Sequence, residues 1–341
     1  MKPRIFFAFV GPSLALMLIF IAAPLISVLV QSFYVNEGTF EEVTAEECTP
    51  GFPDPICTTT VRSVPVLDEA GLPVTNARFV GLQNYRLRLQ PERVSDAFSA
   101  VGGGIPALLN IDFYKALRFT VTFTLITLPL VLALGLGIAV AVHHAVQSIR
   151  GPVIFISLLP FIITPIVGCL SIRWLFIGDG IMTSFLEWIS GQQISMFAQG
   201  WTIEVLMLFY RVWHVAPFAF VIFYAALQTV NQDSIDAAVV DGASRMERFR
   251  YVVIPHLMPL IIFVSLIHLM DSYRVFEEVI GFSSQAFRIS LQWLTFDLLT
   301  PDDAGNRAIP RASASSMLTM IGIVILLVPL IMRTYRDHRR G

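Results

Sequence analysis

The sequence predicts an all-α membrane protein with six transmembrane helices and a long extracytoplasmic loop inserted between helices 1 and 2. Two observations carry this prediction. Of the 341 residues, 55% are hydrophobic and 14% are charged, and the mean hydropathy is +0.70, which is too apolar for an ordinary soluble domain. The apolar residues also collect in six runs, each long enough for the roughly 20 residues that a helix needs to cross a bilayer.

Polar or charged stretches separate the six runs along the chain. The first, at 5–36, contains no charge, and we interpret it as a membrane span because it is too long for a signal peptide and is followed by no clear cleavage site. Arg211 and His214 interrupt the fourth run, and His268 lies inside the fifth. The later runs lie at 119–142, 151–172, 205–230, 251–270 and 312–332.

Basic residues predict which side of the membrane each loop occupies, because short cytoplasmic loops collect Lys and Arg. They occur before the first run, between the second and third, before the fifth and after the sixth, which all fall on one side in a six-span protein. Both termini are therefore expected in the cytosol. The expected organisation is a segment with helix 1 at 1–36, an extracytoplasmic loop at 37–112, and a core at 113–341 with a cytoplasmic loop at 231–255. The basic residues are Lys2, Arg4, Arg150, Arg245, Arg248, Arg250, Arg333, Arg336, Arg339 and Arg340.

The extracytoplasmic loop is acidic where it begins and contains two of the three cysteines. Cys48 and Cys57 lie in this loop, where an oxidising compartment would allow a disulfide to form between them. Cys169 lies inside an apolar run and is expected to be a small buried hydrophobic residue. The acidic residues are Glu37, Glu41, Glu42, Glu46 and Glu47.

A short amphipathic stretch separates the third and fourth runs. Met182, Phe185, Trp188 and Ile189 recur at helical spacing. This pattern predicts a helix that lies along the outer membrane interface. The alternative is that these residues form an ordinary aromatic belt at the ends of the spans.

The most unusual segment is DAAVVDGASRMERFRYVVIPHLMPL at 236–260, which is polar and rich in small residues between two apolar runs. Asp233 or Ser234 is expected to cap a short helix, with Asp236 in its first turn. Gly242 is expected inside this helix, where a glycine costs about 1 kcal/mol relative to alanine and therefore indicates close packing.

This segment resembles the cytoplasmic EAA loop of permease subunits of bacterial ATP-binding cassette importers. The family pattern of Glu-Ala-Ala, Asp-Gly-Ala, Phe, Leu-Pro and a second Pro is matched with Asp in place of Glu and Ile in place of Leu. In addition, FVGLQNYRLRL at 79–89 resembles a segment that precedes the second span in carbohydrate-type permeases. The matching residues are Asp236, Ala237, Ala238, Asp241, Gly242, Ala243, Phe249, Ile254, Pro255 and Pro259.

The resemblance implies a multi-pass protein of the bacterial inner membrane whose EAA loop docks, as a coupling helix, on a cytosolic ATPase. It implies four kinds of partner: a related second permease that forms a heterodimer with this chain, two ATPase copies, an external solute-binding protein, and membrane lipid. ATP and Mg²⁺ would bind the ATPase, so no cofactor is expected on this chain. The expected ATPase contacts are Asp236, Ala237, Ala238, Asp241, Gly242, Ala243 and Arg245.

Ionisable residues inside spans four and five are candidates for the substrate pathway, because such residues usually face a cavity or a partner. On each span the candidates share one helical face. The resemblance places sugar contacts of related permeases near several of them, whereas the alternative interpretation is that the charged ones form interhelical pairs or reach the headgroups. The candidates are Arg211, His214, Phe218, His268, Asp271, Ser272 and Val275.

Other classes of protein find little support. The net charge of −2 argues against a nucleic-acid partner, and no catalytic, metal-binding or P-loop motif is present. The expected cargo is a sugar or sugar derivative, and Arg211, His214 and His268 indicate a neutral or an anionic one. The alternative is a permease of the same type for a polyamine, an amino acid or another small solute.

Overall fold

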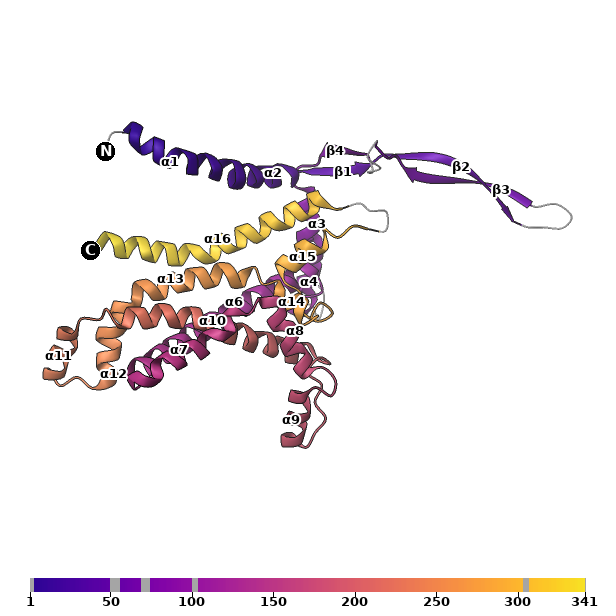
Figure 1. Ribbon diagram of the computed structural model, residues 1–341. Helices are drawn as coiled ribbons and strands as arrows, with labels where there is room; N and C mark the ends of the chain where they lie inside the picture. Colours follow the sequence, from indigo (N-terminus) through magenta and orange to yellow (C-terminus); the bar gives the residue numbers. More distant parts are fainter. Residues whose placement is uncertain (1–2, 50–55, 69–73, 100–103, 303–306, 341) are drawn as a thin grey trace. The chain divides into compact units, whose positions relative to one another are not determined.

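The computed structural model describes residues 3–49, 56–68, 74–99, 104–302 and 307–340, which form two compact units (Figure 1). The first unit comprises Met1–Glu92 and Thr295–Leu318, and the second comprises Arg93–Leu294 and Thr319–Gly341.

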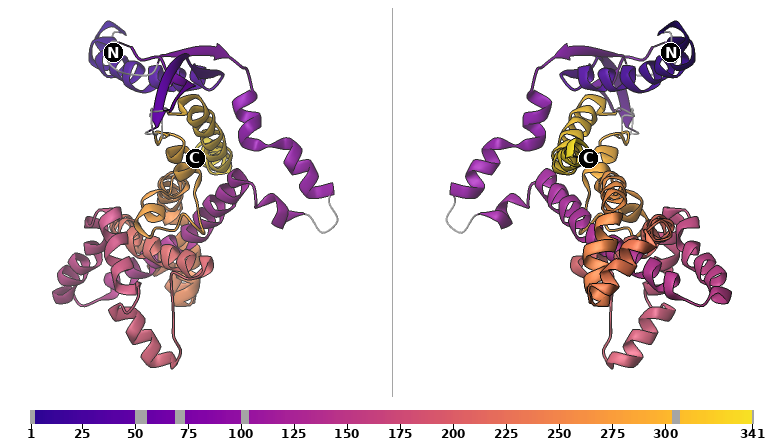
Figure 2. Two further views of the ribbon diagram at one scale, coloured as in Figure 1. Left: turned by 90° about the vertical axis from the view of Figure 1, so that its right-hand side faces the viewer. Right: turned by 90° about the vertical axis from the view of Figure 1, so that its left-hand side faces the viewer.

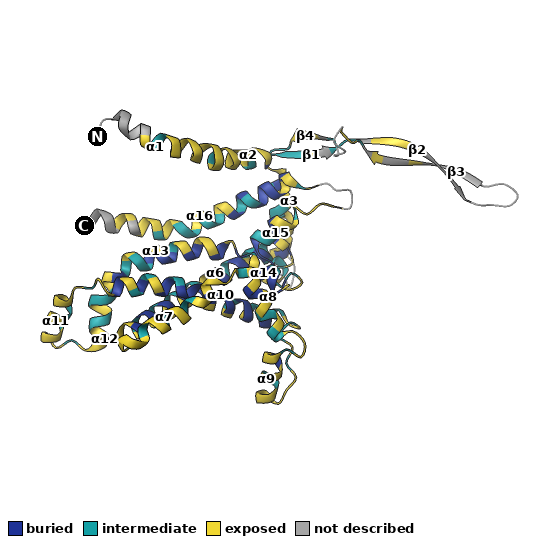
Figure 3. Cartoon of the chain, viewed as in Figure 1, coloured by how far each residue is buried: buried dark blue, intermediate teal, exposed yellow. Residues whose placement is uncertain are grey.

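The first unit begins with one apolar helix made of three segments. These are α1 (Pro3–Met17), a π-helical turn η1 (Leu18–Ala22) and α2 (Ala23–Gln31). From Phe9 to Gln31 its side chains are largely exposed (Figure 3), although this stretch is among the most apolar in the protein. Such a surface is stable only when lipid or another apolar surface covers it, as the sequence predicts for the first span.

Four strands follow in the first unit and form two antiparallel pairs. Strand β1 (Tyr34–Gly38) pairs with β4 (Thr75–Phe79), and β2 (Phe40–Thr49) pairs with β3 (Ile56–Pro65). The sequence analysis predicted no strands in this loop.

Helix α3 (Gln83–Leu89) fastens the first strand pair to the end of α2. The amide of the buried Asn84 donates to the carbonyl oxygens of Ser32 at 2.9 Å and Tyr34 at 2.7 Å. The hydroxyls of Ser32 and Tyr85 are 2.8 Å apart. The stretch at 79–89 therefore has a clear structural role at the exit of the first helix, because Asn84 binds the carbonyl oxygen of the C-cap residue of α2 and that of the first residue of β1.

The register of β2 and β3 sharpens the disulfide prediction, because Cys48 lies directly opposite Cys57. Residues that face each other across an antiparallel pair have Cα atoms about 4.5–5.5 Å apart, which is within the range that a disulfide spans. We expect a thiol-reactive mass tag to label only Cys169 in the denatured, unreduced protein and all three cysteines after reduction. Labelling of all three without reductant would contradict the prediction.

The second unit is a helical bundle with short connecting helices. Helix α4 begins in the first unit, and α15 and α16 also cross the boundary between the units. The elements are α4 (Pro91–Ser99), α5 (Ile105–Leu108), α6 (Asp112–His144), α7 (Gln147–Ile162), α8 (Pro165–Phe176), α9 (Ile181–Ser190), α10 (Gly200–Leu227), α11 (Gln232–Val240), α12 (Arg245–Arg248), the π-helical turn η2 (Phe249–Val253), α13 (Ile254–Tyr273), α14 (Glu277–Gly281), α15 (Leu291–Asp297) and α16 (Ile309–Arg340).

Helix α10 is the centre of this bundle and packs against α6, α7 and α13 (Figures 1 and 3). Its buried face includes Phe220 and Phe223, which pack with Val131 of α6 and Leu257 of α13. Because lipid tails are as apolar as these side chains, helices in a membrane associate through close packing rather than through the hydrophobic effect.

At Gly135, helix α6 lies close against α10. A Cβ atom at this position would lie 2.6 Å from the Cβ of Ala219 and 3.0 Å from the backbone nitrogen of Phe220. We expect Gly135→Leu to destabilise the bundle by about 3 kcal/mol or more, because overpacking against backbone cannot be relieved by a rotamer change. The measurement is the thermal midpoint of the detergent-purified protein. Gly137→Leu is the matched control, because no atom lies within 4 Å of its Cβ position; equal losses would contradict the packing account.

Five helices in the described residues are long and apolar enough to cross a membrane, and they correspond to the first, second, fourth, fifth and sixth predicted runs. The third run differs from a straight span. It folds as α7 and α8, which meet at an angle of 95°. The number of spans is six if this bent pair counts as one.

The bend follows from the local sequence PFIITP at 160–165. Pro165 opens α8, and Ile163 and Thr164 before it are extended. A proline disfavours helical geometry in the residue before it and has no N–H to continue the hydrogen-bond ladder.

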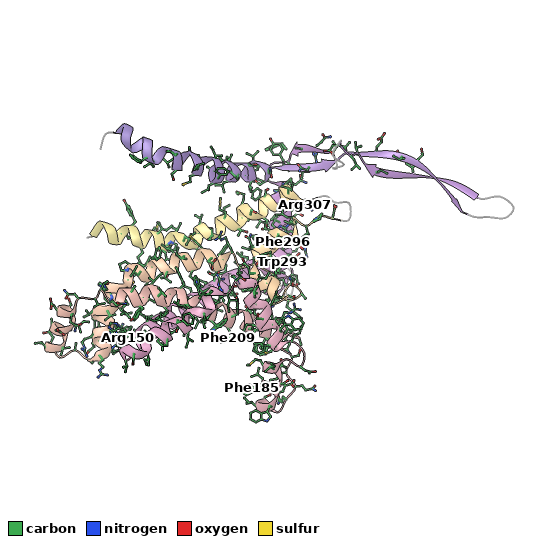
Figure 4. All side chains as sticks on the ribbon, viewed as in Figure 1. Arg150, Phe185, Phe209, Trp293, Phe296 and Arg307 are labelled. Atoms are coloured by element: carbon green, nitrogen blue, oxygen red, sulfur yellow. The ribbon has the colours of Figure 1, made fainter. Side chains whose placement is uncertain are left out.

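The predicted helix in the 181–189 stretch is present as α9, and it projects from one end of the second unit (Figure 2). Phe185 and Trp188 stack with ring centroids 6.3 Å apart, and both side chains are exposed (Figure 4, where Phe185 is labelled). Its placement along the outer interface stays a prediction.

Candidate functional site

Two polar side chains of α10 contact the backbone at the break between α7 and α8. His214 Nε2 lies 2.9 Å from the carbonyl oxygen of Ile163, and the hydroxyl of Tyr210 donates to that of Pro165 at 2.8 Å. Irregular backbone at membrane depth is tolerated where such partners are present or where it lines a cavity. Two polar residues of the fourth span therefore stabilise the break in the third.

A cavity of about 570 Å³ opens beside this break. It lies between the α7–α8 junction, α10 and α13, and its volume is within the range of small-molecule sites. It brings together five of the seven residues that the sequence analysis proposed for the substrate pathway. The five are Arg211, His214, Phe218, His268 and Asp271.

The other two pathway candidates do not line this cavity. The hydroxyl of Ser272 is buried and donates to the carbonyl oxygen of His268 in its own helix at 2.7 Å. Val275 is buried in an apolar cluster with Phe119 and Val279. Val275 lies beyond the end of α13 at Tyr273, so helical spacing no longer determines where it points. Ser272 is on the same helical face as His268 but is completely buried.

Arg211 is the centre of a buried ionic cluster. Its guanidinium pairs with Glu278 Oε1 at 2.9 Å and also forms an ion pair with Asp271. Arg211 and Glu278 are almost completely buried, whereas the carboxylate of Asp271 is 57% exposed. The cluster ties α10 to α13 and α14. The interhelical-pair interpretation therefore holds for Arg211 and Asp271, although both still border the cavity.

The two histidines at the cavity each use one ring nitrogen within the protein. His268 Nε2 lies 3.0 Å from the hydroxyl of Thr127 on α6, and His214 Nε2 contacts the backbone at the break. Within the described part of the chain, the Nδ1 atoms of both rings are buried and have no hydrogen-bond partner. Buried polar atoms are normally satisfied, but these two are enclosed by neighbouring atoms and do not face the cavity in this arrangement.

Three further cavity or cluster residues escaped the sequence analysis. Phe161 of α7 stacks on Phe218 with ring centroids 5.8 Å apart and lines the cavity. Glu277 also lines it, and Glu278 completes the ionic cluster. The sequence signal for Glu278 is the carboxylate pair Glu277 and Glu278 a few residues after the fifth apolar run. A carboxylate that is buried there needs a cationic partner.

The polar segment at 231–255 forms a second candidate site at one end of the bundle (Figure 1). Its helix α11 is capped by Asn231, whose side chain accepts from the N–H of Asp233 at 2.9 Å. The expectation that Asp233 or Ser234 is the cap was therefore wrong. Asn231 follows the previous span by too few residues to be recognised as a helix start from sequence alone.

The expected position of Gly242 inside this helix was also wrong. Helix α11 ends at Val240, and Gly242 has φ of +80°. The N–H of Gly242 donates to Val239 at 3.0 Å and that of Ala243 to Ala238 at 2.9 Å, which is the bond pattern of a Schellman helix end. A Cβ at Gly242 would meet no atom within 4 Å. Backbone geometry, rather than close packing, explains the glycine.

The chain turns directly from this helix end into α12. The Ser244 hydroxyl oxygen accepts a hydrogen bond from the backbone N–H of Glu247 at 3.3 Å, and the Glu247 carboxylate accepts one from the backbone N–H of Ser244 at 2.7 Å. This reciprocal pair is a capping box. The segment is thus a fixed helix–turn–helix, with Val240 87% exposed at its tip.

The seven residues expected to contact an ATPase all lie on this helix–turn–helix. Asp236, Ala237, Asp241, Gly242 and Arg245 are exposed, whereas Ala238 and Ala243 are partly buried. An exposed valine beside small residues is a surface that another protein can cover closely.

Comparison with known families decides the class of this protein. A family described as the binding-protein-dependent transport system inner membrane component matches residues 99–340, which is more than half of the chain. The chain belongs to this family. Helices α5 to α16, the cavity and the helix–turn–helix segment all lie within the matched residues. The matched part of the chain therefore contains both candidate sites.

Curated relatives in the family are permeases of sugar transport systems. The chain is 26% identical over 221 residues to an arabinooligosaccharides transport system permease protein of Halalkalibacterium halodurans, covering 64% of this chain and 63% of that one. It is 26% identical to a trehalose/maltose permease protein of Thermococcus litoralis (71% and 75% covered) and to an sn-glycerol-3-phosphate permease protein of Shigella flexneri (51% and 59% covered). The matches to the first and third span less than two thirds of those relatives.

The fold of the chain is also that of a solved importer. A bacterial ABC transporter involved in the import of the acidic polysaccharide alginate has a chain that superposes with a TM-score of 0.66 at 17% sequence identity, covering 98% of this chain and 96% of that one. The likeness establishes the permease fold.

Proposed function

We propose that this chain is a permease subunit of an ATP-driven importer, which moves a sugar or sugar derivative delivered by an external binding protein. The family description names binding-protein-dependent transport and the inner membrane, and relatives named for sugar and glycerol phosphate transport support the cargo class. The single observation that carries the proposal is the cavity at the α7–α8 break. Transport sites commonly form where interrupted helices expose polar groups at bilayer depth.

The cavity chemistry suits a sugar. Phe161 and Phe218 present an aromatic surface for the apolar face of a sugar ring, and the polar side chains of His214, His268 and Asp271 line the same cavity. Sites of this kind pair apolar walls with a few placed polar groups.

The charges at the cavity favour an uncharged sugar over an anionic one. Two arginines and two carboxylates line the cavity, namely Arg211, Arg274, Asp271 and Glu277, and the buried Glu278 adds a third carboxylate beside Arg211. Arg211 is already neutralised by two carboxylates, so it offers little attraction to an acid. A small cationic solute such as a polyamine is the second candidate, because exposed Asp271 and Glu277 line the cavity.

The helix–turn–helix at 231–255 is the proposed contact with the ATPase. Its fixed backbone and exposed tip suit a segment that transmits movement from a docked protein to the bundle. ATP and Mg²⁺ would bind that separate subunit, and no chemistry is proposed on this chain. Two ATPase copies and a related second permease would complete the importer, with alternating access as its mechanism: ATP-driven closure moves this segment and reorients the cavity.

The proposed orientation places both termini and the 231–255 segment in the cytosol and 37–112 outside. The basic residues at 245–250 and 333–340 support this arrangement through the positive-inside rule.

The cargo proposal is tested by uptake in cells that depend on this chain. Labelled neutral disaccharide, uronic acid disaccharide and putrescine are compared in cells with wild type, Phe161→Ala or Phe155→Ala. Phe155 is the matched control, because it lies on the same helix, is 63% exposed and does not line the cavity. We expect uptake of the neutral sugar alone, weakened at least tenfold by Phe161→Ala only. Uptake of putrescine instead would establish the second candidate, and equal effects of the two variants would contradict the cavity as the pathway.

A further inference from the structure

A second cavity, of about 770 Å³, lies beneath the helix–turn–helix segment, and the proposed function leaves it unexplained. Its walls come from the ends of α6 and α10, from Ile235 of α11, and from α12 and the π-helical turn that follows it. It shares no lining residue with the cavity at the α7–α8 break.

The lining divides into a basic part and an apolar part. His143, His144, Arg245 and Arg248 form the basic part, and the other seven lining residues are apolar, among them Leu227 and Phe249. No carboxylate is among the lining residues. The nearest acidic neighbour in sequence, Glu247, is held by the backbone of Ser244 in the capping box. One part of the cavity wall is therefore cationic, and the remainder is apolar.

The two arginines have no counter-charge in the described part of the chain. Neither guanidinium forms an ion pair there, and Arg248 Nε is buried without a hydrogen-bond partner. This contrasts with Arg211, which two carboxylates neutralise. A guanidinium that lines a cavity and has no counter-charge can form strong, charge-assisted hydrogen bonds with an anion there.

We propose that an anionic phospholipid of the cytosolic leaflet binds in this cavity. Its phosphate would accept hydrogen bonds from Arg248 and Arg245, and an acyl chain would cover Leu227, Phe249 and the other apolar walls. The apolar walls favour a lipid over a soluble phosphate, and basic pockets between helices at the cytoplasmic surface are known to select acidic headgroups. The bound lipid would connect α12 to α6 and α10, and so brace the segment that we propose to contact the ATPase.

The test is a binding measurement on the full-length protein purified with its partners in a neutral detergent, without ATP or sugar. Native mass spectrometry measures the dissociation constants of dioctanoyl phosphatidylglycerol, dioctanoyl phosphatidylcholine and glycerol phosphate. We expect phosphatidylglycerol to bind about tenfold more tightly than phosphatidylcholine, and Arg248→Gln and Arg245→Gln each to weaken it about fivefold. Arg250→Gln is the matched control: Arg250 is exposed, lies 5.9 Å from the Tyr251 ring centroid and does not line the cavity. It should leave the affinity within about twofold.

Equal affinity for the two lipids would overturn the proposal, as would equal losses in the Arg248, Arg245 and Arg250 variants. Glycerol phosphate binding as tightly as the lipid would identify a site for a soluble anion and would also overturn it. Because the measurement involves no transport, its failure would leave the importer proposal standing, and failure of sugar uptake would leave lipid binding standing.

Discussion

Replacing Arg211 by Gln should destabilise the protein by about 3–5 kcal/mol, the usual cost of leaving a buried charge without its partner. Glu278 has no exposed surface, and its Oε1 accepts from Arg211 at 2.9 Å. Without the guanidinium, its carboxylate must either stay charged in an apolar interior or take up a proton, and both alternatives cost free energy. The measurement is the thermal midpoint of the purified complex, which should fall by about 10 °C.

Two further variants separate the lost charge pair from a general effect of the mutation. Arg274→Gln is the control, because Arg274 borders the same cavity but is exposed. Among the described residues its side chain donates only to the carbonyl oxygen of Met270, at 3.3 Å. This substitution should change the midpoint little. Arg211→Gln combined with Glu278→Gln should recover part of the loss, since neither partner is then charged. A single Arg211 variant as stable as the Arg274 variant would show that the ionic cluster contributes little.

Replacing Gly242 by Val should abolish capture of the ATPase and reduce uptake by at least tenfold. Gly242 has φ of +80°, and holding a residue with a side chain there costs about 1–2 kcal/mol. A β-branched residue would therefore open the Schellman turn and change the angle between α11 and α12. The measurement is the amount of ATPase that co-purifies with the tagged chain, together with uptake by intact cells.

Gly191→Val is the matched control for this prediction. Gly191 also follows a helix, has φ of +66° and has open space around its Cβ position, but it ends α9 at the opposite end of the second unit (Figure 1). The same backbone strain should therefore leave ATPase capture unchanged. Equal loss in the two variants would mean that strain impairs folding generally, and retained capture in Gly242→Val would count against the contact at 231–255.

The transmembrane helices were predictable because uncharged apolar runs of this length have few other stable structures. The bend in the third run could also have been predicted, because a proline such as Pro165 disfavours helical geometry in the residue before it. Counting apolar residues alone does not reveal it. The strands β2 and β3 were missed because the acidic residues suggested an irregular loop, although the Thr- and Val-rich stretch at 56–65 has high strand propensity.

Most residues of the candidate site could be predicted from the sequence, but the ion pairs between them could not. Helical spacing correctly put Arg211 and His214 on one face, yet it could not reveal that Glu278 lies against Arg211, because these residues are 67 positions apart and meet only through packing. For the same reason, the charge of Arg211 suggested a neutral or an anionic cargo before its two carboxylate partners were known. Gly242 was misread because the same residue suits a close helix contact and a helix end, and only the backbone angle distinguishes them.

The most direct test of the importer proposal is the ATP hydrolysis of the complex that purifies with this chain from its native membrane. We predict that an ATPase and a second permease co-purify, and that hydrolysis rises several-fold when the binding protein is added together with its sugar but little when either is added alone. A chain that purifies without an ATPase, or a complex whose hydrolysis does not respond to the loaded binding protein, would contradict the account.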